Sequence, residues 1–232
     1  MLDMIMETLG PLADPRGEDH ASVRAEALVY VAKLTGKDTV HQMQAFADHE
    51  AALGGTPDTA QNYKSEFLQR LEKVRSARLD ALQAGDRTAA SLLVPGTLEI
   101  LSKLRASGVA LYLSSGTDHR ALVFEAGLLG LTPFFEERIL GAGPGGSTKA
   151  DLLARIVAEG TNPADIVFFG DGPVEIEATR EIGGVAVGLA TDEPECLVVH
   201  PKKRAWLIDA GADFIVPNYL PEGLVEAVIP SV

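Results

Sequence analysis

Apolar residues in about the first 90 positions recur at steps of three and four, the spacing of amphipathic helices. One such stripe ends at Gly36, a second at the pair Gly54–Gly55, and a third, with Pro57 in its first turn, at Gly85. No alternating strand pattern interrupts them, so we expect an all-helical domain here. The apolar face of the third helix should consist of Tyr63, Phe67, Leu71, Val74 and Ala81.

The pattern changes after Val94-Pro95-Gly96, where short β-rich runs begin to alternate with helical segments. This alternation is typical of an α/β domain with a parallel sheet. A helix over Thr97–Ala106 should lead into Val109–Leu113, whose unbroken apolar character suits a strand buried on both faces. We therefore expect a helical domain of residues 1–92 and an α/β domain of residues 93–232. Further strands are expected at 138–140, 166–169, 185–189 and 214–216.

Composition and charge restrict the partners of this chain. Hydrophobic residues make up 46% and charged residues 23% of the 232 positions, as in folded globular proteins. The formal net charge of −13 disfavours binding to nucleic acid or to anionic membranes, which requires clustered basic residues. A small anionic substrate remains compatible with this charge, because a metal ion and a few donors can reverse the potential locally.

Other features indicate a cytoplasmic location. Cys196 is the only cysteine, so no disulfide can form within the chain. The segment 1–10 has no basic residue, unlike the start of a secretory signal. No apolar run approaches the roughly 18 residues needed to span a bilayer.

The end of the first expected strand carries candidate phosphate-binding groups. Ligands of open parallel sheets bind beyond the carboxyl ends of the strands. There the chain reads Ser114-Ser115-Gly116-Thr117, which offers hydroxyl groups and accessible backbone amides to a phosphoryl oxygen. A simple turn is the alternative interpretation of these small residues.

Lys149 should lie in the first turn of a helix capped by Ser147 or Thr148. The positive end of the helix dipole disfavours a lysine there, so Lys149 is expected to face an anion or carboxylates. A solvated lysine is the alternative. The preceding loop is not a nucleotide-binding P-loop, because Ser147 follows Gly146 where that motif requires lysine.

The run 166–175 is the strongest candidate for a metal site. An apolar strand enters Gly170-Asp171-Gly172, and Glu175 follows four residues after Asp171. We expect the glycines to permit a sharp backbone turn, and both carboxylates to hold a hard divalent cation through oxygen. In the alternative interpretation, Asp171 caps a helix that begins at Pro173 and Glu175 faces solvent.

These three places, in this order, resemble the later motifs of the haloacid dehalogenase superfamily. The resemblance implies a Rossmannoid parallel sheet with an inserted helical cap, and Mg2+ as the cofactor. Ser115 and the Gly116 amide would then bind the transferring phosphoryl group, and Lys149 would neutralise it. Asp171 would bind Mg2+, and Glu175 would support the metal or Lys149. Ser114 competes with Ser115 for the hydroxyl role, but only Ser115 stands next to Gly116.

The family's first motif, a strand ending in Asp-x-Asp, is not found in this sequence. Its first aspartate attacks phosphorus in the family, and its strand lies at the centre of the sheet, between the strands ending here at Leu113 and Phe169. We therefore expect the functional polypeptide to have on the order of twenty further residues before Met1, enough for one strand and a loop. The chain as written would then lack the nucleophile and be inactive.

The resemblance implies hydrolysis of a small phosphorylated metabolite through an aspartyl phosphate, and it also permits phosphomutase, phosphonate-cleaving or dehalogenase chemistry. The alternative is a pseudoenzyme or binding module that keeps a phosphate or metal site without the nucleophile. A nucleotide-dependent oxidoreductase is disfavoured, because the glycines of 141–146 do not have the Gly-x-Gly-x-x-Gly spacing.

Overall fold

The computed structural model describes residues 1–13, 17, 19–34, 39–142 and 149–229, without the side chains of residues 20 and 29–34. The chain forms two compact units, Met1–Ala77 and Arg78–Val232. The division falls inside the helix α4 (Ala60–Gln83), earlier in the chain than the expected boundary between residues 92 and 93.

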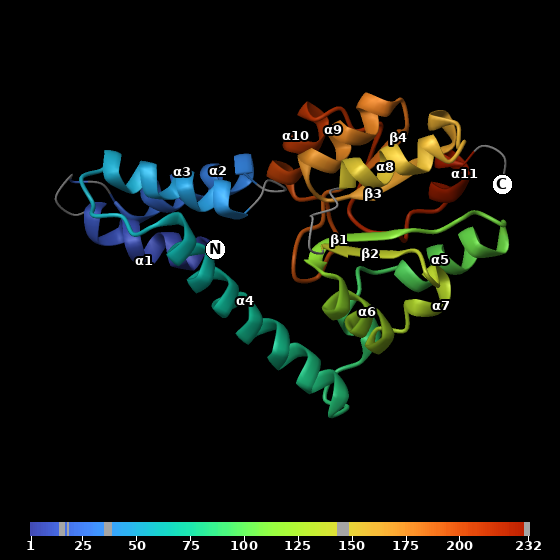
Figure 1. Ribbon diagram of the computed structural model, residues 1–232, viewed down its shortest axis with the longest axis horizontal. Helices are drawn as coiled ribbons and strands as arrows, with labels where there is room; N and C mark the ends of the chain where they lie inside the picture. The colour runs from blue at the N-terminus through green and yellow to red at the C-terminus, as the bar shows by residue number, and fades with distance from the viewer. Residues whose placement is uncertain (14–16, 18, 35–38, 143–148, 230–232) are drawn as a thin grey trace. The chain divides into compact units, whose positions relative to one another are not determined.

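The first unit contains α1 (Leu2–Ala13), α2 (His20–Leu34), α3 (Thr39–Ala52) and most of α4 (Figure 1). Its regular secondary structure is helical, and its described residues contain no strand, as the periodicity predicted. The helices enclose one apolar core, whose larger members are Met4, Ile5, Leu9, Val23, Met43, Phe46 and Tyr63.

The start of α4 differs from the prediction. Pro57 lies before the helix rather than in its first turn. The reason is a local cap: the Thr59 hydroxyl accepts a hydrogen bond from the Asn62 N–H at 3.2 Å, and the helix begins directly after Thr59.

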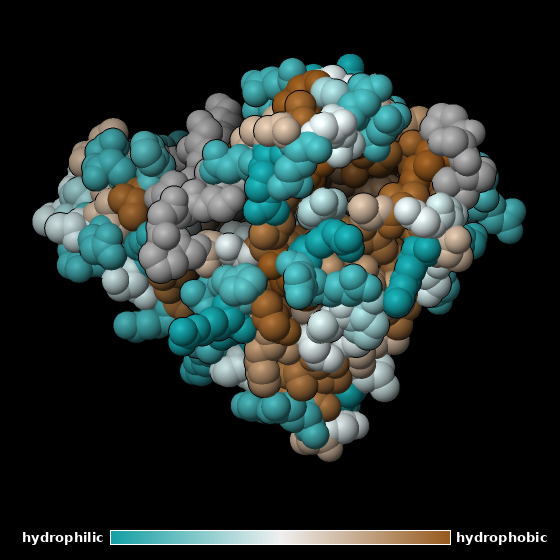
Figure 2. All heavy atoms as spheres, turned by 45° about the vertical axis from the view of Figure 1, so that its right-hand side comes forward, coloured by the Kyte–Doolittle hydropathy of each residue, from teal (hydrophilic) through white to brown (hydrophobic). Residues whose placement is uncertain are grey.

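The apolar stripe of α4 is only partly buried. Tyr63 is buried and Phe67 packs at the edge of the core, but Leu71 and Val74 are 48% and 51% exposed. The expectation that the whole stripe faces a core is therefore wrong for its second half. At 24 residues α4 is about 36 Å long, whereas the 14 residues of α3 reach about 21 Å. Apolar side chains on the surface are brown in Figure 2.

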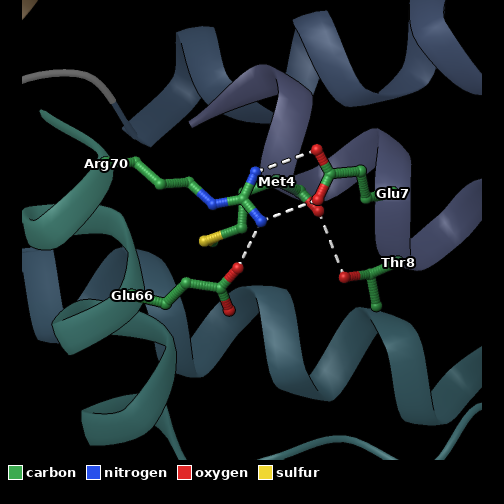
Figure 3. A network of polar contacts seen from close by, with 5 residues as sticks. All are labelled: Met4, Glu7, Thr8, Glu66 and Arg70. Atoms are coloured by element: carbon green, nitrogen blue, oxygen red, sulfur yellow. Dashed lines mark hydrogen bonds and ion pairs between the residues drawn. The ribbon is translucent and has the colours of Figure 1, made fainter. Parts of the chain in front are cut away.

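A surface ion-pair network connects α4 to α1 (Figure 3). The Arg70 guanidinium donates two hydrogen bonds to Glu7, at 2.9 and 2.6 Å, and one to Glu66 at 2.5 Å. These groups are exposed, and such pairs contribute little to stability. Burial of the apolar core therefore provides most of the stability of this unit.

A buried polar pair lies beside that core. The Tyr63 hydroxyl donates a hydrogen bond to Glu50 Oε2 and accepts one from the Asp58 N–H at 3.1 Å. Burial, and then the hydrogen bond to Glu50, raise the pKa of Tyr63 to about 12. The pair thereby connects α4 to α3, and the hydrogen bond from Asp58 adds the loop that precedes α4.

Replacing Tyr63 with phenylalanine should lower the free energy of unfolding by about 1–2 kcal/mol, because the buried Glu50 carboxylate loses its donor. The folded pKa of Tyr63 lies above the unfolded value of about 10. Its contribution is therefore complete below pH 10 and lost as the pH rises towards 12. Urea unfolding of both proteins between pH 7 and 11 should show the difference shrinking above pH 10. A constant difference would contradict the assignment.

The second unit is an α/β domain. Its parallel strands are β1 (Leu113–Asp118), β2 (Ile139–Ala142), β3 (Val167–Gly170), β4 (Val185–Leu189) and β5 (Phe214–Val216). Its main helices are α5 (Thr97–Ala106), α6 (His119–Leu128), α7 (Thr132–Phe135), α8 (Lys149–Ala158), α9 (Pro173–Ile182), α10 (Pro201–Asp209) and α11 (Leu224–Val228).

The strands form two sheets, β1–β2 and β3–β4–β5, with parallel pairing throughout. The α/β fold and the last four expected strands are confirmed, with ends shifted by at most a few residues. The first expected strand, Val109–Leu113, is wrong in position, because β1 begins at Leu113. Pairing with β2 starts there: the Leu113 N–H donates to the Arg138 carbonyl at 2.9 Å, and Leu113 lies opposite Ile139.

Among the described residues, no strand pairs with both β1 and β3, so the two sheets are not joined by backbone hydrogen bonds. Side-chain packing joins them instead. One apolar cluster combines Leu113 of β1 with Val187 and Leu189 of β4, and it is closed by α5, α6, α7 and α11. A second cluster joins side chains of α8 and α9 to Tyr112, Leu140 and Phe168. In Figure 1, α8 and α9 lie on the side of the sheets away from α5, α6 and α7.

Candidate active site

Asp171 directly follows the last residue of β3, as predicted. Its side chain is exposed and makes no hydrogen bond or ion pair with a described residue. The interpretation of Asp171 as a helix cap is wrong, because Gly172 occupies the N-cap position of α9 and Pro173 the first turn. The carboxylate is therefore free to bind a ligand.

Glu175 and Lys149 form an ion pair at the start of α9 and α8. Lys149 Nζ lies 2.8 Å from Glu175 Oε1, which also accepts a hydrogen bond from the Gly172 N–H at 3.2 Å. Glu175 is buried, so the interpretation of this residue as solvent-facing is wrong. Its Oε2 is also buried and has no hydrogen-bond partner among the described residues.

The glycines around Asp171 have a different role from the one expected. Gly172 has an ordinary φ of −115°, and Gly170 is not among the glycines with positive φ, so neither is needed for a left-handed turn. A Cβ atom at Gly170 would lie 2.5 Å from Glu175 Cγ, and one at Gly172 would lie 2.9 Å from Glu175 Oε2. Both glycines make room for the Glu175 side chain.

Ser115 and Gly116 lie within β1 rather than after it, which corrects their expected position. The pairing of β1 with β2 becomes irregular between Ser114 and Asp118. Ser115 Oγ donates to Thr117 Oγ1 at 3.1 Å and accepts from the Thr117 N–H at 3.2 Å. Gly116 is exposed.

A family model for haloacid dehalogenase-like hydrolases matches residues 10–183, which include Ser115, Lys149, Asp171 and Glu175. This chain belongs to the haloacid dehalogenase-like hydrolase family. The resemblance based on the three motifs is therefore confirmed at the level of the family.

Individual proteins are similar to this chain over most of its length. A phosphoglycolate phosphatase of Synechococcus elongatus is 26% identical over 156 residues, which are 66% of this chain and 67% of that protein. A conserved haloacid dehalogenase-like protein of unknown function from Agrobacterium tumefaciens has a TM-score of 0.59 at 19% identity, over 86% of this chain and 82% of that one.

Two further solved structures have the same fold. A hydrolase of this family from Deinococcus radiodurans, with bound phosphate and sodium, has a TM-score of 0.55 at 22% identity, over 98% of this chain and 90% of that one. A predicted phosphoglycolate phosphatase from Haemophilus somnus has a TM-score of 0.57 at 16% identity, over 94% of this chain and 88% of that one.

The structure brings only some of the expected site residues into contact. Lys149 and Glu175 are paired, and α8 packs against both β1 and α9. No hydrogen bond between described residues joins Ser115 to Lys149 or to Asp171. Ser147 and Thr148, the expected caps of α8, lie outside the described residues. No helix in the described part of the chain is long and apolar enough to cross a bilayer.

The oxygen atoms present fit a hard divalent cation. Mg2+ usually binds one or two protein carboxylates and completes its coordination with water and substrate oxygens. Asp171 offers a free carboxylate, and Glu175 Oε2 is a buried acceptor without a partner in the described structure. No cluster of three or more His, Cys, Asp or Glu residues with metal-binding geometry occurs among the described residues.

The sequence patterns did not single out Tyr219, which packs beside β3. Its ring packs edge-to-face on Phe169, with centroids 5.7 Å apart and an interplanar angle of 63°. Burial, and then the negative charge of Asp171, raise the pKa of Tyr219 to about 12. The rule that ligands bind beyond the carboxyl ends of strands could have found it, because Tyr219 follows shortly after β5.

Proposed function

We propose that this chain is a magnesium-dependent phosphohydrolase acting on a small phosphorylated metabolite. The observation that carries the proposal is the partly buried Lys149–Glu175 ion pair together with the free carboxylate of Asp171. A structural ion pair does not require a neighbouring unpaired carboxylate and a buried carboxylate oxygen without a donor. A site for a cation and a phosphoryl group accounts for all three features.

Each residue has a role in this proposal. Lys149, oriented by Glu175, places a positive charge opposite the phosphoryl oxygens, and Ser115 Oγ and the Gly116 N–H donate hydrogen bonds to them. Asp171 binds Mg2+, and Glu175 Oε2 is a second candidate ligand. Bound Mg2+ would supply positive charge that stabilises the transferring group. The attacking aspartate of the family's first motif has no counterpart in this sequence, so no residue is assigned to form an aspartyl phosphate. Phosphate release by this chain would contradict the expectation that it is inactive.

The first unit, Met1–Ala77, is proposed as the helical cap that determines substrate choice. We expect 2-phosphoglycolate to be the first substrate worth testing, because the similar protein of Synechococcus elongatus is a phosphoglycolate phosphatase.

A phosphate-binding or metal-binding module without turnover is the second candidate. Two observations favour it: no strand of the described residues joins β1 and β3, and the sequence contains no Asp-x-Asp segment. Such a module would keep the ligand contacts of Lys149 and Asp171 and lack the chemistry.

Phosphate release from a panel of small phosphate esters that includes 2-phosphoglycolate tests the first candidate. We expect release that EDTA abolishes and that falls about 100-fold or more in kcat/KM for Asp171→Asn and Ser115→Ala, because each change removes a group that stabilises the reacting phosphoryl oxygens. Ser102→Ala is the matched control, since Ser102 is an exposed serine on α5 whose hydroxyl bonds only to the Leu98 carbonyl.

The result also separates the two candidates. Calorimetric binding of Mg2+ and inorganic phosphate without release from any ester would favour the binding module. Absence of both release and binding would contradict both candidates.

A further inference from the structure

The second half of α4 carries a strip of exposed apolar side chains. Leu68, Leu71 and Val74 follow one another at steps of three residues and are 43%, 48% and 51% exposed. Residues three and four apart are neighbours on a helix surface, so the three side chains form one strip, the α4 stripe. The apolar core of the first unit ends on this helix at Phe67. The α4 stripe is therefore apolar surface that the core of its own unit does not use.

The rim of the α4 stripe is mostly basic. Lys64, Arg75 and Arg78 each stand four residues from a member of the stripe, and Glu72 is paired with Arg75. Lys64 and Arg78 make no hydrogen bond or ion pair with a described residue. An antiparallel pair of α4 helices centred on Leu71 would place Lys64 of one copy against Arg78 of the other, and such like charges repel. The stripe therefore suits an apolar surface with an acidic rim better than a second α4.

A surface of that kind lies on the loops that follow β4 and β5. Leu197, Val198 and Leu220 are 61%, 59% and 55% exposed. The buried Asn218 side chain joins the two loops, because it donates to the Cys196 carbonyl at 2.7 Å and accepts from the Leu220 N–H at 2.9 Å. The three apolar side chains therefore lie close together, and we call them the loop patch.

The loop after β4 is held in shape by its own contacts. The His200 N–H donates to the Ala190 carbonyl at 2.8 Å and closes the base of the loop. Lys203 Nζ donates to Thr191 Oγ1 at 3.1 Å and to Glu193 Oε1 at 3.0 Å. A loop that is already ordered loses little conformational entropy when it binds a partner.

The rim of the loop patch is acidic. Glu195 stands two residues before Leu197 and Glu222 two residues after Leu220, and both are exposed. Neither carboxylate makes a hydrogen bond or ion pair with a described residue. The loop patch therefore has an apolar centre like the α4 stripe and a rim of the opposite charge.

We propose that this chain associates with itself, and that the α4 stripe of one copy binds the loop patch of another. Apolar centres with polar rims of opposite charge are the usual composition of a specific interface. The formal net charge of −13 disfavours an anionic membrane as the partner of the basic rim. The two surfaces are small, so we expect association over a range of about 10 µM to 1 mM rather than a permanent oligomer.

Sedimentation velocity of the whole chain tests this inference. The mean sedimentation coefficient of the wild type should rise with concentration, and it should rise less at about 0.5 M salt, which screens the charged rims. Leu71→Glu should abolish the rise, because it places a charge in the centre of the α4 stripe. Gln69→Glu is the matched control, since it adds the same charge at an exposed position on the opposite face of α4. Both substitutions are at exposed positions, so the urea midpoint should not change.

A charge exchange tests whether these two surfaces meet each other. Lys64→Glu with Arg78→Glu reverses the rim of the α4 stripe, and Glu195→Lys with Glu222→Lys reverses the rim of the loop patch. Each double variant alone should remain monomeric, because like charges then meet in its contacts. An equimolar mixture of the two double variants should associate like the wild type, because every contact between unlike copies again joins opposite charges.

Three results would overturn the inference. They are a wild type that sediments as a monomer at every concentration, association that persists in Leu71→Glu, and a mixture of the double variants that stays monomeric. Binding of the wild type to phosphatidylserine vesicles without self-association, if lost in Leu71→Glu, would assign the α4 stripe to a membrane instead. Val74→Gln provides a second, milder variant of the stripe if Leu71→Glu is unstable, and it should weaken the association in the same way.

Discussion

Lys149→Met should lower the free energy of unfolding by about 2–3 kcal/mol, because it leaves a buried carboxylate without its counter-charge. Lys149 Nζ lies 2.8 Å from Glu175 Oε1, and the only other donor to that carboxylate among the described residues is the Gly172 N–H. The estimate stays below the value for a fully buried pair, because the Lys149 side chain is 30% exposed.

Urea unfolding at pH 7 measures this effect, and a second substitution identifies its cause. Lys149→Met combined with Glu175→Gln should recover most of the lost free energy of unfolding, because the neutral amide of glutamine needs no counter-charge. Lys103→Met, at an exposed position of α5, should leave the urea midpoint unchanged. If the double substitution were as unstable as Lys149→Met alone, the loss would come from packing rather than from the buried charge.

Gly170→Ala should lower the free energy of unfolding by about 2–4 kcal/mol. The added Cβ would lie 2.5 Å from Glu175 Cγ, an atom in the middle of the side chain that cannot move away without moving the carboxylate. Glu175 would lose its position beside Lys149, and phosphate release should fall with it.

The Glu175→Ala background tests this steric explanation. Without the Glu175 side chain, Gly170→Ala should lower the free energy of unfolding much less. The effects of the two substitutions on that free energy, measured by urea unfolding, should therefore be clearly non-additive. Gly127→Ala in α6 is the control, and it should be neutral or slightly stabilising, because a Cβ there meets only the Thr132 hydroxyl, at 3.8 Å. An undiminished cost in the Glu175→Ala background would refute the clash with Glu175.

The sequence alone was sufficient for features that depend on neighbours in the chain. The helix Thr97–Ala106 and the strands at 185–189 and 214–216 have the predicted bounds, because periodicity and flanking glycines act locally. Lys149 does open a helix, and Asp171 does follow a strand. The order of these motifs was sufficient to indicate the family, which the family model then confirmed.

Only the tertiary structure decided what depends on residues distant in the chain. β1 starts at Leu113 because its pairing with β2 begins there, with Leu113 opposite Ile139. The residues around Leu113 in the sequence do not indicate where this pairing begins. Leu71 and Val74 are exposed because α4 is longer than the helices it packs against. Glu175 is paired with Lys149, 26 residues away in the sequence. Its side chain occupies the space that a Cβ atom at Gly170 or Gly172 would need, which explains why glycine stands on both sides of Asp171. Periodicity in the sequence indicates which face of a helix or strand is apolar, but not which other element packs against that face. The geometry of the site depends on that packing.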